Sequence, residues 1–300
     1  MIAITTNTVQ LLGTSISVTT MASTCARIMS LVQERKSAYM CFATAHMLVE
    51  AQRHPEIREA YRAADMVNPD GVPLAWCLKL NGFGTAECVS GPRLFPALLR
   101  EAANNGIYVG FYGGREETLE RIRLRINREL RDLKVSYMHS PPFRRLTEKE
   151  RETDLKQIIE SGTEILFVGL GSPKQECWMW QCSGRMPCVS LGIGAAFEFF
   201  SGEKILPPLW IQNLGLTWLV RLCQEPRRLI GRNLASPIFV ALFVKEFVAS
   251  VIEKWVGLGA YKSSKELCKD KANHRGSHQG RIVEVKQDSE RELDRVEISL

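Results

Sequence analysis

Several familiar signatures are missing from this sequence. It contains no Asp-x-Asp pair, the short pattern by which many sugar-nucleotide enzymes hold a divalent metal. It also contains no complete G-x-x-x-x-G-K-[ST] or G-x-G-x-x-G pattern, the glycine-rich signatures of P-loop and dinucleotide-binding proteins. Its five histidines form no Ser-His-Asp set with a recognisable spacing. If the protein is a sugar-nucleotide enzyme, the first of these absences favours chemistry without a bound metal, and no cofactor is expected.

Two further absences concern the cell compartment. The nine cysteines are odd in number and scattered, so a disulfide framework is not expected and a reducing cytosol fits best. The N-terminal segment has neither a basic region nor a continuous apolar core, so no secretory signal is expected. The most apolar stretch, 235–259, is interrupted by Lys245 and Glu246, well short of the roughly 20 residues that a span needs. We expect a chain that does not cross a membrane but is able to lie on one.

The composition is that of a folded and mildly basic protein. Hydrophobic residues make up 45% and charged residues 24%, as in ordinary globular proteins. The net charge of +6, without a basic stripe on a known module, suits anionic small molecules or an anionic membrane surface rather than nucleic acid. We expect three parts: a core over 1–205, a helical appendage that is basic and rich in Trp and Phe over 206–260, and a charged, disordered tail over 261–300.

Short apolar runs alternate with helical patterns along the core. This alternation predicts right-handed crossovers and an α/β fold with a Rossmann-like, mainly parallel sheet flanked by helices. The expected strands are 38–43, 107–112, 135–138, 165–168 and 189–193. The expected helices are 21–36, 46–64, 72–79, 94–103, 116–130, 148–161 and 174–181.

Glycine-rich turns follow three of these strands, with the sequences GFYGGREE, VGLGSPKQE and LGIGAAFEF. Ligands of parallel sheets bind at the carboxyl ends of the strands, where glycine lets the backbone approach a phosphate. Gly113, Gly114 and Gly171 are therefore candidate contacts for a nucleotide or sugar phosphate. The alternative is that these glycines end buried strands for packing reasons.

Two polar clusters are candidates for chemistry. Asp70, in NPDGVPLAW, either caps the helix that begins at Val72 or serves as a general base in a cleft. Lys174, Gln175 and Glu176 fill the first turn of another helix. They either form a solvated helix start or bind a nucleotide or sugar.

The appendage carries a run of arginines in RLCQEPRRLIGR. Arg221 and Arg228 are seven residues apart, about two helical turns, and Arg232 follows. Arginine matches phosphate oxygens in a bidentate way. These side chains are candidate ligands of a pyrophosphate, or form a basic surface helix that contacts anionic lipid.

Taken together, these motifs resemble the WecG/TagA/CpsF family of glycosyltransferases, family 26. The matching segments occur in the family's order over about residues 10–245. They are LLGTSISVTT, ATAHMLVEA, ADMVNPDGVPLAW, VSGP, VGFYGG, ILFVGLGSPKQECW, GIGAAFEFFSG and GLTWLVRLCQEPRRLIGRN. The resemblance implies a Rossmann-like core with a helical appendage that associates with the cytoplasmic face of the membrane. It also implies self-association of the core when the appendage is displaced, and a monomer at the membrane.

The resemblance implies an activity as well. Family members transfer a sugar, such as N-acetylmannosamine, glucose or a similar hexose, from a UDP-sugar to a lipid-pyrophosphate-linked sugar, with inversion and without a metal. Asp70 matches the family's general base, and Gln175 with Glu176 matches its donor-site pair. Arg221 and Arg228 match arginines that close over the pyrophosphate, and Arg232 is a further match.

The sequence departs from the family pattern at several expected cleft positions. Thr44 replaces a frequent asparagine, and Arg93 and Glu198 each replace an aspartate. Thr217 replaces a glutamate, and KILPPLW replaces a run that usually reads Arg-Ala-Pro before Trp. These departures bear on sugar specificity. They also leave open a non-catalytic protein that binds a UDP-sugar or lipid carrier. A nicotinamide-dependent oxidoreductase is a third, weaker hypothesis, because the sequence has no clear counterpart of the acidic residue that follows the glycine motif in such folds.

Overall fold

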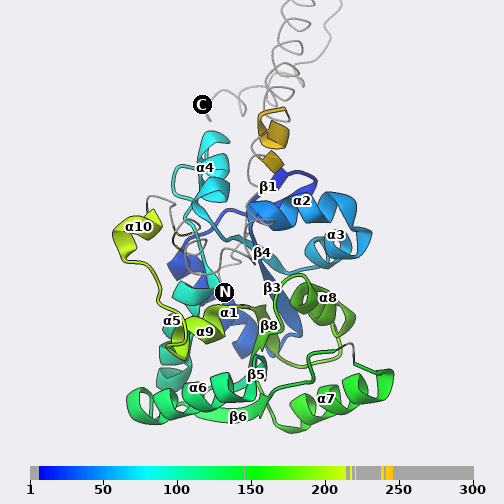
Figure 1. Ribbon diagram of the computed structural model, residues 1–300, viewed down its shortest axis with the longest axis vertical. Helices are drawn as coiled ribbons and strands as arrows, with labels where there is room; N and C mark the ends of the chain where they lie inside the picture. Colours follow the sequence, from blue (N-terminus) through cyan, green and yellow to red (C-terminus); the bar gives the residue numbers. More distant parts are fainter. Residues whose placement is uncertain are drawn as a thin grey trace, which may run out of the picture. The chain divides into compact units, whose positions relative to one another are not determined.

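The computed structural model describes residues 7–144, 146–213, 217, 220, 238, 239 and 241–245. Within them, an antiparallel hairpin precedes a parallel sheet with helices on both faces (Figure 1). This architecture confirms the predicted α/β class. Most of the predicted appendage and all of the predicted tail lie outside the described residues, as do Arg221, Arg228 and Arg232.

The central sheet has six parallel strands in the order β4-β3-β8-β7-β5-β6. Their bounds are β3 (Ala38–Ala43), β4 (Met66–Pro69), β5 (Tyr108–Gly113), β6 (Lys134–His139), β7 (Ile165–Gly169) and β8 (Val189–Gly192). Because every strand runs in the same direction, all six carboxyl ends lie along one edge. In such sheets this edge is where ligands bind.

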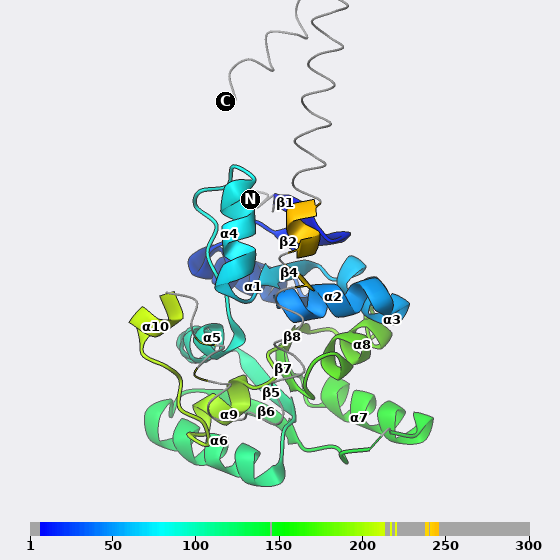
Figure 2. The same cartoon turned by 45° about the horizontal axis from the view of Figure 1, so that its top comes forward.

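Alternating side chains of the strands divide the interior into two clusters. In β3, Tyr39 and Cys41 belong to the first core cluster, whereas Met40 and Phe42 belong to the second. This is the period of two expected for a strand that is buried on both faces. The helices follow the same division, and Figure 2 shows them on the two sides of the sheet.

Each cluster is covered by its own set of helices. The second cluster packs under α1 (Met21–Gln33), α5 (Gly91–Asn105), α6 (Glu116–Glu129) and α9 (Ala196–Phe200). The first packs under α2 (Ala45–Arg53), α3 (Pro55–Arg62), α4 (Val72–Leu80), α7 (Glu148–Glu160) and α8 (Lys174–Gln181). The short helix α10 (Leu209–Asn213) follows the core.

Several elements differ from the sequence predictions. Strand β4 and helix α9 were not predicted. The single helix predicted over 46–64 is wrong, because α2 ends at Arg53 and α3 begins at Pro55. Proline cannot donate a hydrogen bond inside a helix but fits its first turn, so it starts a new helix here. The hairpin of β1 (Thr8–Leu11) and β2 (Thr14–Ser17) was not predicted. Its tight turn places Leu12 and Gly13 at positive φ, as a two-residue hairpin turn requires.

A short stretch of the appendage packs against the core. Phe239 is buried in the first core cluster, and Leu242 and Phe243 pack against it. The rings of Phe239 and Phe243 stack with their centroids 6.3 Å apart. Among the described helices, none is long and apolar enough to cross a membrane.

Candidate functional site

The sequence-predicted residues of the core gather at the carboxyl edge of the sheet. The strand register aligns Ala43 with Pro69, so Thr44 and Asp70 follow the ends of two neighbouring strands. Likewise Val168 aligns with Gly192, which places the turn that leads into α8 beside the turn after β8. Segments far apart in the sequence therefore contribute to one site, as a parallel sheet requires.

Asp70 is held at this edge by the main chain. Its N–H donates to the carbonyl of Ala43 at 2.8 Å, and Val89 N–H donates to Pro69 at 2.9 Å. The N-cap of α4 is Gly71, at φ 123°, and α4 has no side-chain cap. The alternative in which Asp70 caps the helix is therefore wrong, because the turn at Gly71 starts the helix one residue later. Asp70 precedes this N-cap by one residue.

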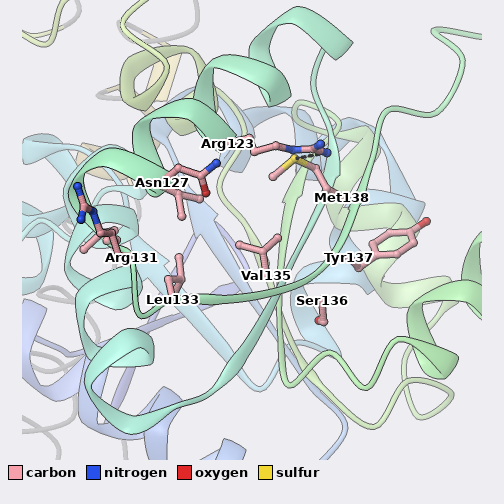
Figure 3. Close-up of a pocket in the computed structure, with 10 residues that line it drawn as sticks. Arg123, Asn127, Arg131, Leu133, Val135, Ser136, Tyr137 and Met138 are labelled. Carbon is pink, nitrogen blue, oxygen red and sulfur yellow. Dashed lines mark hydrogen bonds between the residues drawn. The ribbon is translucent and has the colours of Figure 1, made fainter.

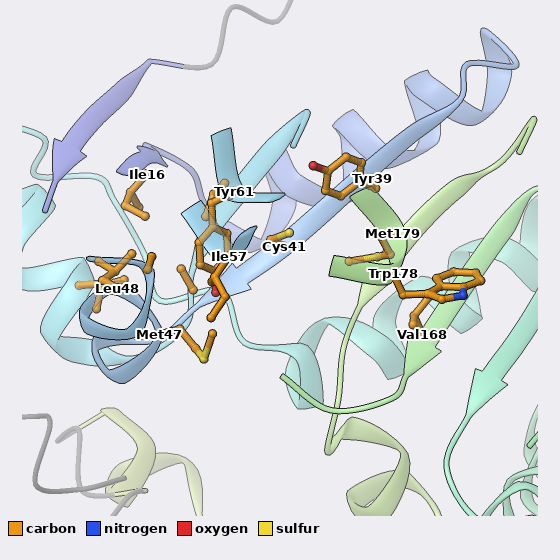
Figure 4. Close-up of a cluster of buried hydrophobic side chains, with 14 of the residues drawn as sticks. Ile16, Tyr39, Cys41, Met47, Leu48, Ile57, Tyr61, Val168, Trp178 and Met179 are labelled. Atoms are coloured by element: carbon orange, nitrogen blue, oxygen red, sulfur yellow. The ribbon is translucent and has the colours of Figure 1, made fainter. Parts of the chain in front are cut away.

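The phenol of Tyr61, on α3, is buried in the first core cluster. Burial raises the pKa of Tyr61 well above its ordinary value, and the nearby charges of Glu176 and Asp70 raise it further. The phenol lies near Cys41 in the first core cluster (Figure 4). Tyr61 was not predicted as a site residue. Its position four residues after Ile57 on an apolar helix face is typical of an ordinary core residue.

Gln175 and Glu176 are buried, in contrast to the solvated helix start that was the alternative. Gln175 is 3% exposed and Glu176 is 0% exposed, whereas Lys174 is exposed. The amide nitrogen of Gln175 donates to the carbonyl of Gly192 at 2.7 Å and to Glu176 Oε1 at 3.0 Å. Its buried Oε1 has no hydrogen-bond partner within the described part of the chain. Such an atom costs free energy unless a ligand supplies a donor.

The predicted phosphate-binding glycines have two different environments. A Cβ on Gly113 would lie 2.6 Å from the carbonyl carbon of Gly169, and one on Gly114 would lie 3.1 Å from the Phe197 ring. Close packing and a positive φ therefore favour glycine at both positions, whether or not a phosphate binds there. Gly171, at φ +80°, has no atom within 4 Å of its Cβ position. It is therefore the member of the set whose backbone is open to an approaching ligand.

Thr44 is the N-cap of α2. Its Oγ1 accepts a hydrogen bond from Met47 N–H at 3.3 Å, which is the ordinary role of threonine before a helix. That bond uses a lone pair of the hydroxyl, so the hydroxyl hydrogen is still able to bind a ligand. Thr44 is thus compatible with both capping and substrate contact.

The other departures from the family pattern have varied surroundings. Glu198 forms an ion pair with Lys204 on the segment that leaves α9. Arg93 is exposed in the first turn of α5, and Thr217 is half-buried. The ion pair gives Glu198 a structural partner, so a role in substrate binding is not required to explain it.

Cys88 lies close to Asp70, and we expect its thiol to react slowly. Gly71 N–H donates to its Sγ at 3.1 Å. Burial, and then the Asp70 charge, raise the Cys88 pKa to about 12. At pH 8 the thiolate fraction is then about 10⁻⁴. We expect Cys88 to resist iodoacetamide in the folded protein at pH 8 and to react faster as the pH rises. The measurement is mass spectrometry of the Cys88 peptide, with urea-unfolded protein as the control. Equal labelling of folded and unfolded protein would contradict the expected protection of Cys88.

A cavity of about 460 Å³ lies between α6 and the outer strand β6. It is separate from the residues described above. Arg123, Asn127, Arg131 and Tyr137 are among its lining residues, and Arg123 reaches Met138 across it (Figure 3). None of the predicted site residues lines this cavity. It is therefore not the predicted site. Among the described residues, no group of three His, Cys, Asp or Glu side chains is arranged to hold a metal ion.

Comparison with protein families agrees with the resemblance seen in the sequence. The model of the glycosyl transferase WecG/TagA/CpsF family matches residues 9–251. The matched range includes the whole parallel sheet, together with Asp70, Gln175 and Glu176. The chain therefore belongs to the WecG/TagA/CpsF family of glycosyltransferases, which act in the synthesis of cell-surface polysaccharides.

Proposed function

We propose that the protein is an inverting, metal-independent glycosyltransferase. Its donor is a UDP-hexose or UDP-N-acetylhexosamine, and its acceptor is a sugar linked to a polyprenyl pyrophosphate. The observation that carries this proposal is the convergence of Asp70 and the buried Gln175–Glu176 pair at the carboxyl edge of the sheet. The family membership supports the reaction class.

Asp70 is the general base of the proposed reaction. Its carboxylate takes the proton of the acceptor hydroxyl while that oxygen attacks the anomeric carbon of the donor. The bond from the anomeric carbon to the UDP oxygen breaks, and UDP leaves with the bonding electrons. Because attack and departure occur on opposite faces of the sugar, the configuration inverts. Main-chain hydrogen bonds fix the backbone of Asp70 at the edge of the sheet, and a carboxylate on a fixed backbone is suited to this proton transfer.

The Gln175–Glu176 pair holds the donor sugar. Gln175 Oε1 is buried without a partner among the described residues, and a sugar hydroxyl is a donor of suitable kind for it. The Glu176 carboxylate accepts a hydrogen bond from Gln175, and in the proposed complex it also contacts the sugar. Thr44, on the neighbouring strand end, positions the sugar or acceptor through its hydroxyl.

The leaving UDP needs positive charge and N–H donors. The open backbone at Gly171 and the exposed Lys174 lie at the start of α8, where free N–H groups and the helix dipole favour an anion. Arg221, Arg228 and Arg232 complete the proposed neutralisation. In a reaction without a metal, such groups stabilise the charge that develops on the pyrophosphate.

The proposed acceptor also sets the place of action. A polyprenyl-linked sugar is confined to a membrane, so the protein must work at a membrane surface. We propose the inner face of the plasma membrane, reached from the cytoplasm. A net charge of +6 supports attraction to an anionic leaflet.

The test is UDP release from a panel of UDP-sugars, with a synthetic polyprenyl-pyrophosphate-linked GlcNAc or glucose and with EDTA present. We expect release with one donor, and only when the acceptor is present. Release that requires added Mg²⁺ or Mn²⁺ would overturn the metal-independent mechanism. UDP binding without transfer from any donor to any acceptor would favour a non-catalytic binding protein.

A further inference from the structure

Helix α4 presents an exposed apolar face next to Asp70. Trp76 is 56% exposed and Leu80 is 63% exposed, and Pro73 is also exposed. The spacing of these three residues, i, i+3 and i+7, places them in one row along the helix. The opposite face, with Leu74 and Leu78, is fully buried in the first core cluster. The helix is thus apolar on both sides, although only one side meets the core.

The charges around this face fit an anionic lipid surface. Between Asp70 and Glu87 the only charged residue is Lys79, which is exposed and flanks Trp76. An exposed tryptophan with a neighbouring lysine is typical of segments that rest at a membrane interface, where the indole and the ammonium remain near the headgroups. A helix face that contacts only water is usually rich in charged residues, unlike this face of α4.

A second set of exposed apolar side chains lies at the same end of the core. Figures 1 and 2 both draw α4 and the 238–245 segment at the same end of the core. There Ile238 is 41% exposed and Val244 is 51% exposed, and Lys245 is exposed as well. Phe239, by contrast, is buried in the core cluster. The described part of the apolar 235–259 stretch therefore buries Phe239 in the core and leaves Ile238 and Val244 at the surface.

We propose that the Pro73–Trp76–Leu80 face of α4 inserts into the interfacial region of an anionic lipid bilayer. The inference rests on the proposed function, because a lipid-linked acceptor must reach Asp70, and α4 begins directly after the Asp70–Gly71 turn. A helix that rests on the bilayer there would hold the catalytic carboxylate beside the headgroups that carry the acceptor. The partner is a lipid surface, and a second copy of the chain is the alternative that the experiment distinguishes.

The test uses the full-length chain and vesicles of phosphatidylglycerol and phosphatidylcholine, with brominated phosphatidylcholine as a quencher of tryptophan fluorescence. No sugar donor or acceptor is added, so the result is independent of transfer activity. We expect part of the fluorescence to be quenched in the wild type and that part to be lost in Trp76→Phe. Trp178→Phe, which removes a buried tryptophan on α8, should retain it. Equal quenching in wild type and Trp76→Phe would overturn the proposal.

A second measurement compares binding to the same vesicles by co-sedimentation. Trp76→Ser/Leu80→Ser is expected to weaken binding by about tenfold or more, since two large apolar side chains no longer enter the interface. Leu124→Ser is the matched control, because Leu124 is 61% exposed on α6, and its binding should be unchanged. Unchanged vesicle binding by the double variant, with a shift from dimer to monomer in sedimentation velocity, would overturn the proposal in favour of an interface between two copies.

Discussion

Replacement of Asp70 by asparagine is expected to lower the turnover number by about 10² to 10⁴-fold, the usual contribution of a general base. The amide has nearly the same shape as the carboxylate but does not accept the acceptor's proton. The main-chain bonds that place residue 70, including the 2.8 Å bond to Ala43, do not depend on the side chain. UDP should therefore bind Asp70→Asn as it binds the wild type. The measurements are UDP release with acceptor present and calorimetric titration with UDP.

The matched control is Asp65→Asn, just before the amino end of the same strand. Asp65 Oδ2 accepts a hydrogen bond from Tyr39 N–H at 2.9 Å, and the asparagine oxygen is able to accept it as well. This variant should keep its turnover number, because the amino ends of parallel strands lie far from a site at the carboxyl ends. Wild-type turnover in Asp70→Asn would remove Asp70 from the role of base. A fall of similar size in both variants would indicate a loss of folding instead.

The sheet was largely predictable because local patterns determine it. Buried runs such as AYMCFA predict a central strand, and β3 occupies those residues, Ala38–Ala43. The turn chemistry of Asp-Gly and of Gly-rich segments marks where strands end. The single long helix over 46–64 failed for the opposite reason. There the apolar periodicity continues through His54 and Pro55, and the proline's missing donor outweighs the pattern.

The site was predictable by its residues but not by its environment. Gln175 and Glu176 follow the predicted strand 165–168, so their place at the carboxyl edge follows from topology. Strand β4 before Asp70 was not predicted, so the place of Asp70 at the same edge comes from the structure. Burial does not follow in the same way. The first turn of a helix is normally solvated, and the complete burial of Glu176 results from α3 and β3 packing against α8. Tyr61 joins the site through the same packing, which no local pattern indicates.

The glycines show the same limit. The sequence predicts a phosphate at each glycine-rich turn, because glycine permits close approach of any group. The structure shows that the close neighbour of Gly113 is the backbone at Gly169, 56 positions along the chain. Such contacts between distant segments depend on strand order. Only the fold therefore shows whether a glycine is required by close packing or leaves room for a phosphate.

Alanine at position 113 is therefore expected to destabilise the protein strongly. Its Cβ would lie 2.6 Å from the Gly169 carbonyl carbon, and the residue has φ +105°. The neighbouring group is backbone inside the sheet, which is unable to rotate away as a side chain would. Overpacking and the positive φ together should cost about 2–4 kcal/mol. We expect the melting temperature of Gly113→Ala to fall by about 5 °C or more, as measured by circular dichroism.

Gly171→Ala provides the contrast, because it shares the positive φ without the crowding. At φ +80°, with no atom within 4 Å of the Cβ position, it should lose only about 1 kcal/mol of stability. If the open backbone at Gly171 approaches the UDP pyrophosphate, the new methyl group should weaken UDP binding while the fold persists. Equal stability losses at positions 113 and 171 would contradict the packing explanation. Unchanged UDP affinity in Gly171→Ala would instead remove this turn from the donor site and leave the pyrophosphate to Lys174 and the arginines.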